Sequence, residues 1–191
     1  MTVEPLPPAM TWISSAGGPG TLPIAADFAE DAFEGAFEAL YSRVCWYALT
    51  MLHNGGEAEE VASETFDRAY RAWKSGRGPT GPPLPWLLVI CRRIVLGRRR
   101  RARLIAWLPL PEHGLEPAAE GDAFEAVEFR LWLRQLEGIV SGRELEALSL
   151  RYLEDLGDAG AAQVLGLSPS GFRTLLSRAI AKLRTHPELW K

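Results

Sequence analysis

The side chains best suited to binding a ligand lie near the C-terminus, in the stretch DAGAAQVLGLSPSGFRTLLSRAIAKLR. This pattern predicts a short helix, a tight turn over 166–168 and a second helix with Ser168 as N-cap and Pro169 as first helical residue. Arginine pairs with guanine or phosphate, and serine and threonine bind phosphate. We therefore predict a helix-turn-helix that contacts duplex DNA, in preference to a bundle whose polar face is merely solvated. The predicted contacts are Ser168, Ser170, Arg173, Thr174, Ser177 and Arg178.

A second basic feature is a run of seven arginines between Arg92 and Arg103. Positive charges at a helix C-terminus interact favourably with the helix dipole, which accounts for one or two of the arginines but not for seven. Contact with phosphate is the better interpretation. Trp86 stands between this run and an irregular Pro- and Gly-rich loop, and it is either a core residue or a platform on which a base stacks.

An acidic face is expected on the helix that precedes the loop. Glu57, Glu60, Glu64 and Asp67 lie on or near the side opposite its apolar residues. Such faces are usually only solvated, so the residues by themselves give little support to a partner site.

Composition excludes several classes of protein. The net charge of −3 argues against a general nucleic-acid coat, while the absence of Lys and Arg before Arg43 indicates that charge is segregated. The sequence has no P-loop, GxSxG, HExxH or paired-carboxylate motif, so we do not expect an enzyme or a cofactor. The histidines are scattered and Cys45 and Cys91 sit in apolar helical patterns, which indicates free thiols and no metal site. Without an apolar run of ~20 residues or a signal peptide, a cytoplasmic protein with no membrane insertion is expected.

Apolar periodicity predicts an all-α fold with two small helical domains and no strands. Helices are expected over 27–53 and 57–73, separated by Asn54-Gly55-Gly56, and another from Trp86 into the arginine run. Residues 75–85 are expected to be irregular because of their prolines and glycines. Ser141 and Glu144 form a capping box, and Asp158 is expected to cap the first helix of the helix-turn-helix. The expected divisions are a flexible tail at 1–27, a domain at 28–103, a flexible linker at 104–123 and a second domain at 124–187.

The order of these pieces resembles the extracytoplasmic-function group of the sigma-70 family over roughly residues 33–185. The matching segments are FEALYSRV, EAEEVASETFDRAYRAW, PWLLVICRRIVLGRRRR and SGRELEALSLRYLEDLGDAGAAQVLGLSPSGFRTLLSRAIAKLR. The last segment resembles region 4 without a gap. Two such blocks in this order are much harder to obtain by chance than one.

The resemblance implies a promoter-recognition subunit with a region 2-like bundle and a region 4-like helix-turn-helix. Its implied partners are core RNA polymerase (through the β′ clamp helices and the β flap), promoter DNA and an anti-sigma factor. The second predicted helix resembles region 2.2, and the implied polymerase-docking residues are Glu60, Ser63, Glu64 and Asp67. The loop and the helix from Trp86 resemble regions 2.3 and 2.4, and the implied contacts to the −10 element are Arg77, Trp86, Arg92, Arg93, Arg98 and Arg99. The recognition helix is implied to contact the −35 element.

The sequence departs from the family pattern at both DNA-binding ends. The approach to the −10 loop carries prolines at 82, 83 and 85 where the family has a Phe and a basic residue, and Leu175 replaces a usual basic residue in the recognition helix. Two alternatives therefore stay open: a stand-alone helix-turn-helix regulator, and a sigma-like adaptor with weakened DNA recognition.

Overall fold

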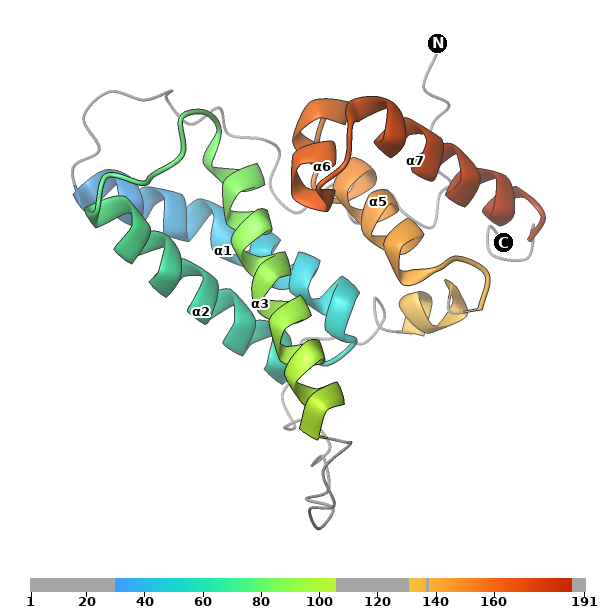
Figure 1. Ribbon diagram of the computed structural model, residues 1–191, viewed down its shortest axis with the longest axis horizontal. Coiled ribbons are helices and arrows are strands. Elements are labelled where there is room, and N and C mark those ends of the chain that lie inside the picture. Colours follow the sequence, from blue (N-terminus) through green and yellow to red (C-terminus); the bar gives the residue numbers. More distant parts are fainter. Residues whose placement is uncertain (1–29, 106–130, 137, 187–191) are drawn as a thin grey trace.

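A computed structural model describes residues 30–105, 131–136 and 138–186, and these residues form helices joined by turns and loops (Figure 1). The first unit consists of α1 (Glu30–Leu52), α2 (Gly55–Lys74) and α3 (Pro83–Ile105). The second contains α5 (Gly142–Tyr152), α6 (Asp158–Leu165) and α7 (Pro169–Arg184). The all-α prediction is confirmed. The expected tail and most of the expected linker lie outside the described residues.

The core of the first unit is built where α1, α2 and α3 pack on one another. Val44, Val61, Leu88 and Val95 are fully buried there. Toward the start of α1, the ring of Phe33 packs within 5.1–6.3 Å of the rings of Phe66, Tyr70 and Trp73. These three aromatic residues of α2 are therefore packing residues, and they anchor α1 on α2.

Two helix boundaries differ from the sequence-based expectation. Asn54 does not merely end a helix: its side chain accepts a hydrogen bond from the backbone N–H of Glu57, so Asn54 is the N-cap of α2 and Gly55 lies in the first turn. Likewise, α3 begins at Pro83 rather than near Trp86. The first-turn N–H groups of a helix have no intrahelical partner, so prolines there lose nothing. The expected irregular loop is correspondingly shorter.

The second unit contains the predicted helix-turn-helix. Ser168 caps α7 by accepting from the N–H of Gly171, and Gly166 adopts the left-handed conformation (φ 65°) that ends α6. The capping box of Ser141 and Glu144 is confirmed. The expected capping role of Asp158 is wrong: Gly157 is the N-cap of α6 and makes no side-chain cap bond, while the Asp158 carboxylate pairs with Arg151.

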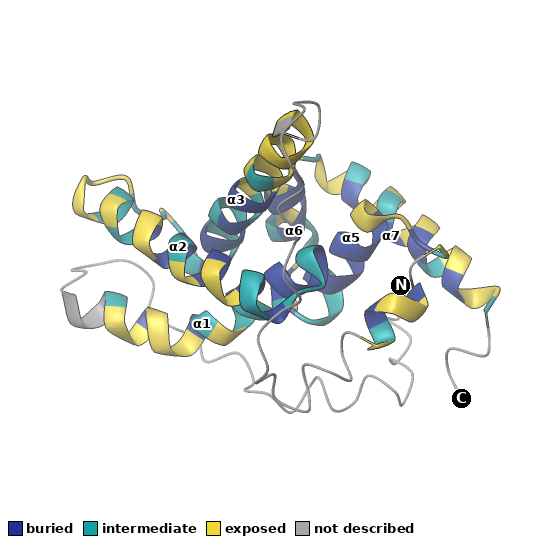
Figure 2. Ribbon diagram, turned by 90° about the horizontal axis from the view of Figure 1, so that it is seen from below, coloured by how far each residue is buried: buried dark blue, intermediate teal, exposed yellow. Residues whose placement is uncertain are grey.

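The two units pack against each other. Helix α1 contacts α5, and α3 contacts α6, so the start of the second unit lies beside the first unit's DNA-binding candidates (Figure 1). Coloured by burial, the helices turn their buried residues inward and leave the outer side of α7 and the end of α3 exposed (Figure 2). In the described ranges, no helix combines the length and apolarity that a bilayer crossing needs.

Candidate nucleic-acid and partner-binding surfaces

The outer face of α7 presents the predicted duplex contacts. Buried Phe172, Leu176 and Ala179 hold the helix on the second unit, so the intervening positions point outward. The Ser168 hydroxyl is occupied by its capping bond, whereas the guanidinium of Arg173 has only a 3.7 Å contact with Asp158. All six predicted residues are exposed: Ser168, Ser170, Arg173, Thr174, Ser177 and Arg178.

The arginines of α3 divide into three groups, because each points in a different direction. At 100° per residue, Trp86, Arg93 and Arg100 share one face within roughly 40°, and both arginines are exposed. Arg92 points toward the second unit and Arg98 toward α2. Of the remaining candidates, Arg99 donates to the carbonyl of Met51, and Arg77 donates to the hydroxyl of Ser75.

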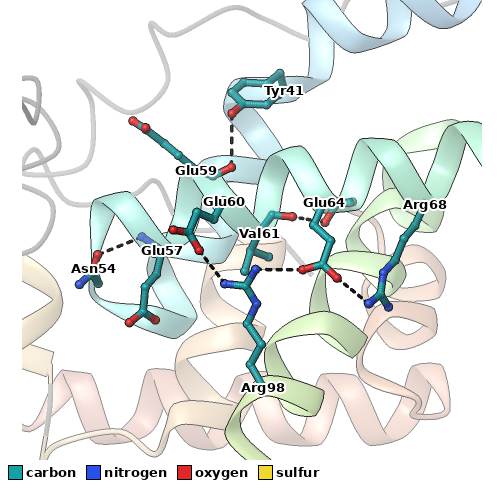
Figure 3. Close-up of polar contacts among 10 residues, drawn as sticks. Tyr41, Asn54, Glu57, Glu59, Glu60, Val61, Glu64, Arg68 and Arg98 are labelled. Atoms are coloured by element: carbon teal, nitrogen blue, oxygen red, sulfur yellow. Dashed lines mark hydrogen bonds and ion pairs between the residues drawn. The ribbon is translucent and has the colours of Figure 1, made fainter. Parts of the chain in front are cut away.

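The acidic face of α2 is partly neutralised from within the chain (Figure 3). Arg98 reaches Glu60 at 3.2 Å and Glu64 at 2.9 Å. Burial alone would raise the pKa of Glu64, but the bonds from Arg98 and Arg68 outweigh it and lower the pKa, so Glu64 stays ionised. The predicted docking surface and one predicted DNA contact are therefore bonded to each other.

Two further docking candidates lie on the same helix. The hydroxyl of Ser63 lies 3.1 Å from that of Tyr41, which ties α2 to α1. The carboxylate of Asp67 is well exposed and lies 3.7 Å from Arg71 one turn away. A pair as exposed as this contributes little to stability, so Asp67 can engage a partner at little cost.

Sequence reasoning missed a set of polar contacts between the units. Arg92 lies 2.6 Å from Glu146, with the two side chains 18% and 9% exposed, and the hydroxyl of Tyr47 donates to the same carboxylate. Arg43 lies 3.0 Å from Glu154, whose side chain is only 2% exposed. The hydroxyl of Thr50 in α1 also lies 3.4 Å from that of Ser149 in α5. We call these side chains the interdomain polar cluster: Arg43, Tyr47, Thr50 and Arg92 from the first unit, and Glu146, Ser149 and Glu154 from the second.

Burial in this cluster raises the pKa of two side chains, Glu154 and Tyr47. Burial raises the pKa of Glu154 to about 7 even though Arg43 opposes the change. Burial, reinforced by the Glu146 charge, raises the pKa of Tyr47 well above its ordinary value. No sequence pattern signals these groups, because their partners are about a hundred residues away along the chain.

Trp86 lies in a cleft shared by the two units. One wall is formed by residues 78–82 with Pro85 and Trp86, and the other by Ala159, Gly160 and Gln163 of α6; the cleft volume is about 450 Å³. Helix α6 approaches the start of α3 at Gly160, where a Cβ would lie 3.5 Å from the Pro85 ring, an ordinary contact distance. The described residues contain no group of His, Cys, Asp or Glu side chains able to hold a metal ion, and Cys45 and Cys91 are free thiols.

Comparisons with known proteins agree with this arrangement. The family model of Sigma-70 region 2 matches residues 36–105, which covers most of α1 and all of α2 and α3. The chain is 25% identical over 158 residues to the ECF RNA polymerase sigma factor SigL of Mycobacterium tuberculosis, covering 82% of this chain and 89% of SigL. It is 26% identical over 157 residues to the ECF RNA polymerase sigma factor BldN of Streptomyces coelicolor, covering 80% and 59% of the two chains.

A solved structure has the same fold. The sigma factor RpoE of Bartonella quintana, in complex with the anti-sigma factor NepR, superposes with a TM-score of 0.63 at 19% identity, covering 84% of this chain and 97% of RpoE. The region 2 match covers the first unit, and the two curated relatives span both units. The predicted resemblance to the extracytoplasmic-function group of the sigma-70 family of RNA polymerase sigma factors is thereby confirmed.

Proposed function

We propose that this chain directs core RNA polymerase to specific promoters, with α7 contacting the −35 element and the end of α3 contacting the −10 element. One observation carries the proposal: a sigma-70 region 2 match over 36–105 is followed in the same chain by a helix-turn-helix whose Arg173 and Arg178 are exposed. On this proposal the chain contributes binding energy and catalyses no reaction itself.

For the −10 element, we propose that the working surface is the face of α3 that carries Trp86, Arg93 and Arg100. The two guanidiniums are exposed and suited to phosphates, and an indole can stack on an unpaired base. Arg92 and Arg98 are less available, because acidic side chains of the chain already hold them. The surface is therefore less basic than the run of seven arginines suggests, and DNA affinity of the free protein should be low.

For polymerase docking, we propose the face of α2 formed by Glu60, Ser63, Glu64 and Asp67. Arg98 offsets one negative charge of this face, so its field is weaker than three carboxylates would produce. Docking then depends on hydrogen bonds and contact area as well as on charge. Since RpoE was solved with the anti-sigma factor NepR, we further propose that an anti-sigma factor binds this chain.

The test is abortive transcription with purified core polymerase, this protein and a library of genomic promoter fragments. Wild-type protein should give defined transcripts, and the double variant E60K/E64K should give none while failing to co-elute with core polymerase. The control E34K/E38K reverses two exposed acids with the same spacing on α1 and should keep both activities.

Reversing the two α2 acids also places lysines beside Arg98, so a folding defect must be separated from lost docking. The triple variant E60K/E64K/R98E restores opposite charges between α2 and α3. It should fold like the wild type and still fail to co-elute with core polymerase, because the docking charges stay reversed. Transcription by either reversed variant would overturn the proposed docking face. A palindromic footprint made by the protein alone would instead favour a stand-alone regulator.

A further inference from the structure

We propose that the outer face of α3 selects single strands that contain thymine, because Leu96 forms an apolar seat for the C5 methyl group beside the arginines that hold the phosphates. This inference rests on the proposed function for the role of the strand in promoter recognition. It adds a residue that determines base selectivity, and that selectivity can be measured separately from transcription.

Exposed apolar side chains lie among the arginines of α3. Within the described ranges, four large apolar side chains are exposed, and two of them, Leu96 and Leu104, belong to this helix. The end of α3 is exposed (Figure 2), and Arg93 and Arg100 are exposed with it. A leucine contributes nothing to phosphate binding, so this surface fits a ligand that carries apolar groups as well as negative charge.

Helix geometry arranges the exposed side chains of α3 in two parallel rows. Residues seven apart lie almost in line along a helix, with a spacing of about 10 Å and a rotation of about 20°. The first row consists of Trp86, Arg93 and Arg100. The second row consists of Val89 and Leu96, and it is rotated from the first by roughly 40–60°. On a helix whose side chains reach a radius of about 5 Å, the two rows are roughly 5 Å apart.

The two rows match the two edges of a single strand. Phosphates lie along one edge and bases along the other, so guanidiniums can hold the first edge while apolar side chains meet the second. Leu96 is 36% exposed and Val89 is half-buried, so both present apolar surface to a ligand. Gly97 borders the arginine row, and a Cβ placed there would reach open space, so the strand can approach from that side.

The chemistry of the second row favours one base. A leucine side chain has no hydrogen-bonding group, so a polar base edge placed against it would lose its bonds to water without replacement. Thymine instead presents its C5 methyl group, which apolar side chains are suited to contact. Trp86 and the arginines bind any strand, because stacking and phosphate contacts carry little sequence information. Selectivity for thymine therefore depends on Leu96.

The test compares strands that differ only in the C5 methyl group. Full-length protein at low salt is titrated into the fluorescent single strands dT20 and dU20, and into dC20 and its 5-methylcytosine counterpart. Each methylated strand should bind about fourfold more tightly than its partner, as expected for one methyl group removed from water. An effect shared by both bases assigns the preference to the methyl group rather than to the hydrogen-bonding edge of thymine.

Substitutions then locate the methyl contact. Leu96→Ala should reduce the preference to less than about twofold, mainly by weakening the methylated strands. The matched control Leu131→Ala truncates another exposed leucine, in the second unit, and should keep the full preference. Because both leucines are exposed, both variants should unfold like the wild type. The double variant R93A/R100A should weaken all four strands equally and keep the preference, because it removes phosphate contacts only.

The outcomes separate this inference from the proposed function. Equal or undetectable binding of dT20 and dU20 by the wild type would overturn the inference, as would a preference that survives Leu96→Ala or disappears in Leu131→Ala. These results would leave the transcription test of the proposed function standing. Unchanged strand binding by R93A/R100A would overturn both the inference and the proposed contact of α3 with the −10 element.

Discussion

Protonation of Glu154 should control how tightly the two units dock. This carboxyl lies in the loop between α5 and α6, is almost fully buried, and faces Arg43 of α1. Burial raises its pKa from 4.5 to about 7. Cys91 of α3 faces the same region, but burial raises its pKa to about 12, and Tyr47 is also raised, so both stay protonated near neutrality. Glu154 is therefore a group of this cluster whose protonation changes as the pH rises through about 7.

The direction in which docking changes with pH follows from proton linkage. The docked state binds the Glu154 proton more tightly than a separated state in which the carboxyl is hydrated. Docking is therefore strongest at low pH, weakens as pH rises from about 4.5 through about 7, and is constant above that. The difference between these two pKa values corresponds to about 3 kcal/mol at about 1.4 kcal/mol per factor of ten, which is an upper bound for the effect of this one group.

Two measurements check this prediction. Carbon-detected NMR of the side-chain carboxyls, assigned by comparison with Glu154→Gln, should give a pKa near 7 for Glu154. The hydroxyls of Thr50 and Ser149 lie 3.4 Å apart between the units, so the variant T50C/S149C can form a disulfide when they are docked. The rate of that disulfide formation, corrected for thiolate fraction, should fall between pH 5.5 and 7.5. The same comparison in a Glu154→Gln background should be flat, because glutamine cannot titrate. A pKa below 4.5 for Glu154 would refute the reasoning, since the Arg43 charge would then outweigh burial.

Two predictions concern α7. Ser168→Ala removes the N-cap bond to Gly171 and should lower the free energy of unfolding of the second unit by about 1 kcal/mol in urea titrations. The control Ser177→Ala, a substitution within the helix, should not cause this loss. Equal losses in the two variants would show that Ser168 does not stabilise the helix as its cap. Arg173→Ala and Arg178→Ala should each reduce the slope of log affinity for duplex DNA against log salt by about 0.9, as expected for one lost phosphate contact, and an unchanged slope would remove that residue from the interface.

Local structure could be predicted from sequence wherever neighbouring residues determine it. Ser168, Pro169 and Gly166 act within one turn of the chain, so the helix-turn-helix and its cap are as expected. The errors at Asn54 and Pro83 have a common cause. Asparagine, glycine and proline are equally suited to ending one helix and starting the next, and only the packing of α1, α2 and α3 selects between these roles.

Whether a charged residue is available to a partner or already bonded within the chain could not be predicted in the same way. Arg92, Arg93 and Arg98 look equivalent in the sequence, but helix rotation alone sends them toward the second unit, toward solvent and toward α2. The acids that hold Arg92 and Arg98 are 54 and 34 residues away. Charge counting therefore overestimated both the basic surface of α3 and the acidic surface of α2, because the two are bonded to each other.

This internal pairing bears on how weak sites can yield a specific promoter complex. With Arg92 and Arg98 held by the chain's own acids, each unit has few unpaired cations on its DNA-facing side, and neither should bind DNA tightly alone. Tethering multiplies weak affinities through effective concentration, but only when both sites can be engaged together. On the proposed function, promoter affinity therefore depends on α7 and the α3 face being engaged at once, and losing either site should weaken promoter binding more than that site's own affinity would suggest.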